Sequence, residues 1–141
     1  IKKFYLPKIN LKFSKYLINY ANTSIDISDG LLIDLNKMIN TQNVSSEIYY
    51  DKIPISNKLK NFLRKNSLKN YKFIFNGDDY QILFTSSKSN RRQIDKISKK
   101  TKTKITRIGK ILSKRRFKIR LLNGNKVLKM AKIPGYEHFF T

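Results

Sequence analysis

The sequence predicts an α+β domain, and three observations support this class. Helical spacing and strand-like alternation follow one another early in the chain, whereas strands cluster late. The 141 residues are the size of one domain and can bury a core. Hydrophobic residues make up 40% of the chain and charged residues 28%, which is typical of a globular protein rather than of a disordered one.

In the first part of the chain the expected elements follow from the spacing of apolar residues. Residues 11–21 carry aromatic and apolar side chains at helical spacing, and residues 24–27 alternate as a short strand. Ser28, Asp29 and Gly30 then open a second helix that runs to about residue 40, with Ser28 or Asp29 expected as its N-cap. Four apolar residues form its expected buried stripe: Leu32, Leu35, Met38 and Ile39.

Turn residues separate the later elements. Asn76-Gly77-Asp78-Asp79 predicts a turn before a strand, and Asn123-Gly124 is the strongest hairpin signal in the chain. The basic segment 114–116 stands between two strand-like segments and is expected to be a hairpin tip. The expected strands are residues 47–50, 80–85, 104–112, 117–122 and 126–130, and the expected helices are residues 56–65 and 90–99. The helix at 56–65 is expected to bury Leu59, Phe62 and Leu63.

The net charge of +22 suggests a nucleic-acid partner, but two features argue against one. The chain is rich in Lys, Ile, Asn and Tyr and poor in Ala, Gly and Pro, a contrast that an AT-rich genome produces without any selection for a partner. The basic excess is mostly Lys, whereas Arg is favoured for bidentate contacts to phosphates and bases. We therefore expect no nucleic-acid partner and keep a basic nucleic-acid-binding module as an alternative.

The absence of cysteine and the single histidine restrict the chemistry. Disulfides and Cys/His zinc sites are excluded, so any metal needs oxygen ligands, which favours magnesium or calcium. His138 is interpreted as a packing or hydrogen-bonding residue rather than as a general base. No apolar run approaches the roughly 18 residues of a membrane span, and no signal-peptide pattern is present. We expect a cytoplasmic protein without a membrane partner.

Residues 26–30, Asp-Ile-Ser-Asp-Gly, are the most informative stretch for function. On an extended strand Asp26 and Ser28 point the same way, and Asp29 follows at the mouth of a helix, where backbone N–H groups favour anions. Two carboxylates and a hydroxyl there are a plausible way to hold Mg²⁺ against nucleotide phosphates. From spacing alone an ordinary helix start is the preferred interpretation, because Asp and Ser are common caps. Asp34, one turn further on, is interpreted as a helix-surface residue or as a residue that supports the ligands.

Three segments, in order, resemble thiamine-monophosphate kinases. Residues 21–35 (ANTSIDISDGLLIDL) resemble the signature that opens the C-terminal half of these enzymes. Residues 77–84 (GDDYQILF) resemble the family's Gly-Gly-Glu-Asp-Tyr-Glu-Leu segment, and residues 135–139 (GYEHF) resemble its terminal Gly-Tyr-x-His-Phe. The resemblance spans essentially the whole chain. It departs from the family at Asp78, which is one methylene shorter than the usual Glu, and at Gln81, which removes a charge.

The resemblance implies a fold, an activity and a set of site residues. The implied fold is the C-terminal domain of the aminoimidazole ribonucleotide synthetase superfamily, a mixed or antiparallel sheet packed with helices. The implied reaction uses ATP as co-substrate and Mg²⁺ as cofactor to convert thiamine monophosphate into thiamine diphosphate. Asp26 and Asp29 are then metal ligands, Ser28 contacts ATP, and Asp78 and Tyr136 contact the substrate. No catalytic residue is assigned, because phosphoryl transfer depends mostly on positioning and on charge neutralisation by metal ions.

The resemblance also implies what accompanies the chain. Residues 1–141 are expected to form a single C-terminal domain, with 1–20 as interdomain lead-in and first helix, and the N-terminal ATP-binding domain lies outside them. No Gly-rich phosphate-binding loop is present, so the chain alone is expected to have negligible kinase activity. The full-length protein is expected to be a homodimer. The alternatives are another ATP-using enzyme of the same superfamily and, from a different class, the nucleic-acid-binding module.

Overall fold

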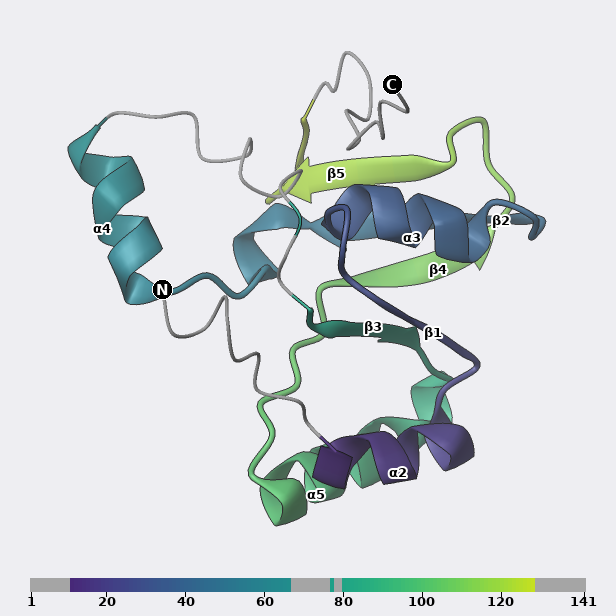
Figure 1. The fold of residues 1–141 in the computed structure, drawn as a ribbon. Coiled ribbons are helices and arrows are strands. Elements are labelled where there is room, and N and C mark those ends of the chain that lie inside the picture. The colour runs from purple at the N-terminus through teal and green to yellow at the C-terminus, as the bar shows by residue number, and fades with distance from the viewer. Residues whose placement is uncertain (1–10, 67–76, 78–79, 129–141) are drawn as a thin grey trace, which may run out of the picture.

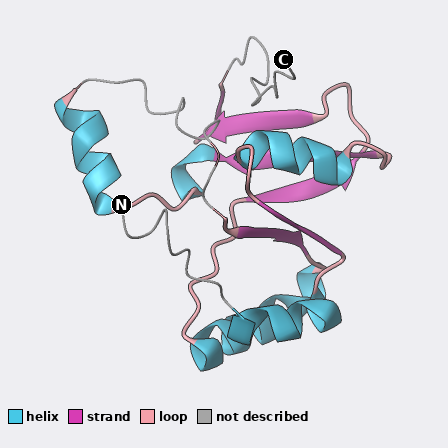
Figure 2. Cartoon of the chain, in the orientation of Figure 1, coloured by secondary structure: helices cyan, strands magenta, loops and turns pink. Residues whose placement is uncertain are grey.

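The computed structural model describes residues 11–66, 77 and 80–128, and these residues confirm the α+β class (Figures 1 and 2). The described elements, in chain order, are α2 (Leu11–Tyr20), β1 (Thr23–Asp26), α3 (Leu31–Ile39), β2 (Val44–Tyr49), η1 (Tyr50–Lys52), α4 (Asn57–Lys65), β3 (Ile82–Thr85), η3 (Lys88–Asn90), α5 (Arg91–Thr101), β4 (Gly109–Ser113), β5 (Ile119–Asn123) and β6 (Lys126–Val127). No helix in these described ranges is long and apolar enough to cross a membrane.

Two sheets organise the described residues. The larger has the strand order β4-β2-β5-β6, in which β2 is antiparallel to β4 and parallel to β5. The smaller is an antiparallel pair of β1 and β3. Helix α3 lies across the larger sheet, whereas α2 and α5 lie together on the far side of the β1–β3 pair (Figure 1). The connection from β1 to α3 therefore leads from the smaller sheet to the helix that covers the larger one (Figure 1).

The core lies between α3 and the larger sheet. All four residues of the predicted stripe are buried: Leu32, Leu35, Met38 and Ile39. They pack in one cluster with Ile48 of β2 and Leu121 of β5. Of the three residues expected to be buried in α4, Leu63 is buried and Leu59 is half-buried, but Phe62 is 56% exposed, so the expectation is wrong for Phe62. Helix α4 stands away from the larger sheet (Figure 1).

The predicted hairpin tip at residues 114–116 is wrong. Strands β4 and β5 do not pair with each other, because β2 lies between them and pairs with both. The connecting segment passes the end of β2, where the Ser45 hydroxyl donates to the Phe117 carbonyl (2.6 Å) and accepts from the Arg115 N–H (2.8 Å). A central, buried strand needs a partner on each edge, and this need prevails over pairing between neighbours in sequence.

The second predicted hairpin is confirmed, with its turn one residue later than expected. Strands β5 and β6 are antiparallel, and Asn123 pairs with Lys126. The two-residue loop is therefore Gly124 and Asn125, and Gly124 has a φ of +56°. A left-handed backbone at the first loop residue is what a type I′ or II′ hairpin requires, and glycine adopts it without steric cost.

Part of the basic excess is paired within the larger sheet. Glu47 on β2 forms ion pairs with Lys110 of β4 (3.0 Å) and Arg120 of β5 (3.5 Å). The hydrogen bond to Glu47 raises the pKa of Lys110 above its ordinary value. One carboxylate thus bridges three neighbouring strands across the sheet face.

Candidate functional site

The candidate site lies where β1 ends and α3 begins. Asp26 is the last residue of β1, pairs with Ile82 of β3 and is exposed. Pairing continues beyond the strands, because the Ile27 N–H donates to the Gln81 carbonyl (2.8 Å) and the Tyr80 N–H donates to the Ile27 carbonyl (2.9 Å). This pairing holds the segment that carries Asp26 beside the segment that follows residues 76–79.

The start of α3 differs from the expectation. Its N-cap is Gly30, with φ 127° and ψ 149°, and no side chain makes a capping hydrogen bond from that position. The prediction that Ser28 or Asp29 supplies the cap is therefore wrong. A positive φ of this size favours glycine, which explains why Gly30 stands at the sharp change from strand to helix.

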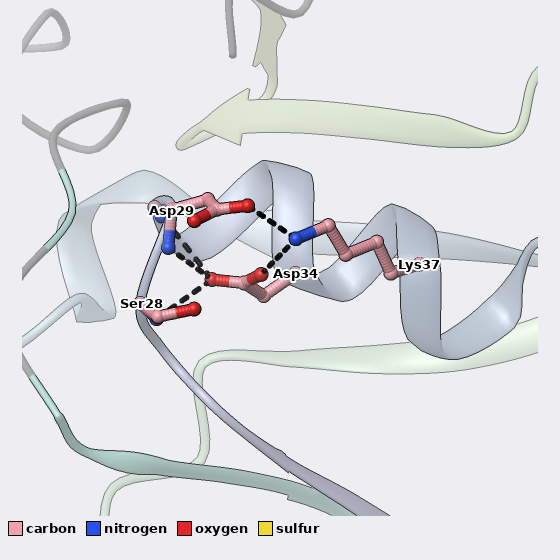
Figure 3. A network of polar contacts seen from close by, with 5 residues as sticks. Ser28, Asp29, Asp34 and Lys37 are labelled. Carbon is pink, nitrogen blue, oxygen red and sulfur yellow. Dashed lines mark hydrogen bonds and ion pairs between the residues drawn. The ribbon is translucent and has the colours of Figure 1, made fainter. Parts of the chain in front are cut away.

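Asp34 satisfies the backbone N–H groups that precede the helix. Its Oδ2 accepts hydrogen bonds from the N–H groups of Ser28 (3.0 Å), Asp29 (3.0 Å) and Gly30 (3.1 Å), as Figure 3 shows. The residue is 1% exposed, so its interpretation as a helix-surface residue is wrong. Donors that converge at a helix start attract an anion, and here the chain supplies that anion itself.

Lys37 joins the two carboxylates on the outer side of this network (Figure 3). Its ammonium forms an ion pair with Asp29 and lies 3.3 Å from Oδ1 of Asp34. Oδ1 is buried, and the Lys37 ammonium is its ion-pair partner. The hydrogen bond with Asp29 is the main reason that the pKa of Lys37 is raised; partial desolvation opposes it and Asp34 adds to it.

Gly77, in the motif at residues 77–84, packs against the motif at residues 26–30. A Cβ built on Gly77 would lie 1.9 Å from the Ser28 carbonyl oxygen and 3.1 Å from the Asp29 carbonyl carbon. Only a residue without a side chain fits against this peptide. Gly77, the described residue of the segment where the sequence predicts a turn, therefore packs directly on the Ser28–Asp29 backbone.

The structure brings three of the predicted site residues together. Asp26, Ser28 and Asp29 occupy one short connection; Asp26 is exposed, Ser28 is half-buried, and the Asp29 side chain is 22% exposed. Asp78, Tyr136 and His138 lie outside the described residues. A separate surface depression of about 600 Å³, lined by Lys88, Ser89, Arg91 and Arg92, lies at the start of α5 and contains none of these residues.

Sequence reasoning left the role of Asp34 open between the helix surface and support of the ligands, and it missed Lys37, although one signal was present. Asp34 stands three residues after Leu31 and four before Met38, and both of those residues are buried. Residues at these spacings share a helix face, so an acidic residue inside an apolar stripe indicated a buried carboxylate. Lys37 follows at i+3, the spacing of an intrahelical ion pair.

The donor set suits a magnesium ion shared with phosphates rather than one enclosed by protein. Within the part of the chain that the structure describes, no group of three His, Cys, Asp or Glu residues can hold a metal. Mg²⁺ commonly takes only one or two carboxylates and completes its shell with water and substrate phosphates. Asp26 and Asp29 can supply those carboxylates, whereas Oδ2 of Asp34 is already occupied by three N–H groups.

Comparison with known protein families identifies the family of this chain. Residues 9–122 match the model of a family described as AIR synthase related protein, C-terminal domain. The chain belongs to this family. Within the chain, the match includes both the connection that carries Asp26, Ser28 and Asp29 and the segment that carries Gly77.

Curated relatives confirm the resemblance to thiamine-monophosphate kinases. The thiamine-monophosphate kinase of Buchnera aphidicola subsp. Schizaphis graminum is 33% identical over 139 residues, which are 99% of this chain and 42% of the relative. That of Aquifex aeolicus is 38% identical over 89 residues, 62% of this chain and 29% of the relative. The chain therefore spans less than half the length of these relatives.

Solved structures confirm the fold. AaThiL complexed with AMPPCP and TMP matches 98% of this chain and 40% of its own, with a TM-score of 0.70 and 28% identity. Escherichia coli HypE, a hydrogenase maturation protein, gives a TM-score of 0.71 over 90% of this chain at 11% identity, which shows the fold alone. The expected AIR synthase-like architecture, helices packed on mixed and antiparallel sheets, is thus confirmed.

Proposed function

We propose that this chain forms part of the metal, nucleotide and substrate site of a thiamine-monophosphate kinase, which transfers the γ-phosphoryl group of ATP to thiamine monophosphate. One observation carries the proposal: Gly77 packs on the Ser28–Asp29 peptide, so two motifs that resemble this family meet at one place. The relatives that share the chain's sequence and fold support the choice of reaction.

Each predicted residue has a role in the proposal. Asp26 and Asp29 bind Mg²⁺, and Ser28 contacts ATP. Asp78 and Tyr136 contact thiamine monophosphate, for which an aromatic ring offers stacking and a cation–π contact with the thiazolium. When bound, the metal neutralises charge on the transferring phosphates. The residues of this chain hold and orient the reactants, and none of them is proposed to form a covalent bond.

The proposal includes what lies outside the chain. We propose that the chain is a C-terminal domain, that an N-terminal domain supplies the remaining nucleotide contacts, and that the full-length protein is a cytoplasmic homodimer. The chain alone then has negligible kinase activity. Support comes from its length relative to the curated relatives, since it spans 42% of the Buchnera enzyme.

The test is thiamine diphosphate formation by the full-length protein, with ATP, Mg²⁺ and thiamine monophosphate. Asp29→Asn keeps the size of the side chain and removes its charge, and we expect the rate to fall by about 10²-fold or more. The matched control is Asp51→Asn, which changes an exposed carboxylate in η1. We expect the control to retain the wild-type rate, and circular dichroism verifies that both variants fold.

The outcomes separate the parts of the proposal. A well-folded full-length protein without turnover contradicts the kinase activity and favours another ATP-using reaction of the superfamily. Turnover that Asp29→Asn leaves unchanged supports the reaction but removes Asp29 from the metal site.

A further inference from the structure

The proposed function leaves Asp34 without a role, although its Oδ2 accepts three backbone hydrogen bonds from the connection before α3. We propose that Asp34 is a positioning residue, whose buried carboxylate occupies the anion-binding position at the start of α3 and fixes the backbone that carries the metal ligands. For the identity of the ligand that this backbone binds, the inference rests on the proposed function.

The first step concerns the backbone donors. Consecutive N–H groups before a helix are a ready binding site for phosphate. Here the N–H groups of Ser28, Asp29 and Gly30 all donate to Oδ2 of Asp34, at 3.0 to 3.1 Å. A nucleotide phosphate therefore cannot use them without displacing a carboxylate from the chain itself. The connection offers the Asp26 and Asp29 carboxylates to a metal, and not N–H groups to a phosphate.

The second step concerns the cost of burying Asp34. A carboxylate that is 1% exposed needs compensation for the water it has lost, and three charge-assisted hydrogen bonds supply most of it. Its buried Oδ1 faces the Lys37 ammonium at 3.3 Å. A buried carboxylate paired in this way is a poor means of increasing stability, because the cost of removing the charge from water offsets the attraction. The Asp34 carboxylate instead fixes the geometry of the backbone, because the N–H groups of three successive residues donate to its Oδ2.

The third step concerns Asp29, which is held from two sides. Its N–H donates to Oδ2 of Asp34, and its carboxylate pairs with Lys37, whose ammonium also lies 3.3 Å from Oδ1 of Asp34 (Figure 3). The main chain of Asp29 is thus bonded to the Asp34 carboxylate directly, and its side chain is linked to the same carboxylate through Lys37. Loss of the Asp34 carboxylate removes the three hydrogen bonds to the backbone. It also removes one of the two ion pairs of Lys37, so that Asp29 is the partner of Lys37 that remains in this network.

The experiment compares Asp34→Asn with Ile39→Val in the full-length protein. Ile39 is buried on the same helix and has an apolar side chain that cannot take part in the polar network, so its variant is a control for a loss of core packing. Two readouts do not depend on turnover. Hydrogen exchange of the peptide that covers residues 27–34 reports how firmly the amides are held, and calorimetric titration with Mn²⁺ or Mg²⁺ alone reports metal affinity.

We expect Asp34→Asn to accelerate exchange of the three amides by at least about 10-fold, and to weaken metal affinity by about 10–100-fold, as for residues that orient metal ligands. Ile39→Val should change neither beyond its effect on global stability. In kinetics, Asp34→Asn should raise the KM for the metal–nucleotide and lower kcat, whereas Ile39→Val should preserve both. If Asp34→Asn does not fold, Asp34→Glu keeps the charge, displaces the carboxylate by one methylene and is expected to give the same two losses.

Lys37→Met distinguishes the hydrogen bonds from the backbone to Asp34 from the ion pairs that Lys37 forms with Asp29 and Asp34. It leaves the three N–H bonds to Asp34 in place, so exchange of these amides should remain as in the wild type, and metal affinity should not fall, because a competing cation is gone. Equal losses in Lys37→Met and Asp34→Asn would overturn the inference, as would an Asp34→Asn variant that behaves like Ile39→Val. A full-length protein that lacks kinase activity but shows the predicted exchange and metal responses would refute the proposed function and support the positioning role.

Discussion

Replacing Gly77 by alanine tests how the two motifs are joined. The added Cβ would lie 1.9 Å from the Ser28 carbonyl oxygen, closer by about 1 Å than a Cβ atom tolerates. The obstacle is backbone, and that backbone is tied to Asp34 through three amides, so it cannot yield without breaking hydrogen bonds. Overpacking of this kind costs about 1–3 kcal/mol of unfolding free energy. We expect urea unfolding of Gly77→Ala to show a loss in this range.

Gly109→Ala is the matched control for this substitution. Its Cβ would meet another backbone carbonyl, that of Glu47, at 2.2 Å, but in the pairing of β4 with β2, away from the connection before α3. Both variants should lose similar stability, and only Gly77→Ala should also weaken binding of the Mg²⁺–ATP complex, measured by calorimetry on the full-length protein. Equal nucleotide affinity in the two folded variants would refute the reasoning that Gly77 shapes the site.

Two further predictions concern a buried hydroxyl and the pH dependence of the polar network. Ser46 is 0% exposed, and its hydroxyl has no hydrogen-bond partner among the described residues. Ser46→Ala should therefore leave the free energy of unfolding in urea unchanged or raise it by about 1 kcal/mol. A clear loss of stability would show that the hydroxyl has a partner. The pKa of Lys37 is raised above 10.5, mainly by its hydrogen bond with Asp29, so its ion pairs stabilise the fold at neutral pH and this contribution is lost as the pH rises through the raised pKa. The stability difference between wild type and Lys37→Met, small because the side chain is half exposed, should therefore shrink as the pH rises through the raised pKa. A difference that stays constant over the alkaline range would contradict this assignment.

Local patterns predicted the elements around the site because their causes are local. The stripe of Leu32, Leu35, Met38 and Ile39 fixes which face of α3 is buried, since a helix repeats every 3.6 residues whatever lies opposite. The loop glycine at 124 follows from backbone sterics that involve only its neighbours. The residue types of Asp26, Ser28 and Asp29 mark a strand–helix junction, but spacing alone favours an ordinary helix start there, and only the resemblance to a known family predicts a site.

Contacts between distant segments could not be predicted in this way. That β2 separates β4 from β5 depends on which strands bury one another, and the apolar alternation of each strand fits several partners equally well. The packing of Gly77 on Ser28 is of the same kind. The sequence predicts a turn at residues 76–79, but only the pairing of residues 80–81 with Ile27 brings Gly77 against Ser28.

The division between sequence and tertiary structure is clearest at the start of α3. By itself the sequence determined an α+β chain with carboxylates at a strand–helix junction, because secondary structure follows from periodicity and chemistry from residue type. Tertiary structure alone decided that the anion at the mouth of the helix is Asp34, one turn inside it. The physical reason is burial: once α3 packs on the sheet, the N–H groups before it lose water, and the nearest acceptor that is buried with them must replace it.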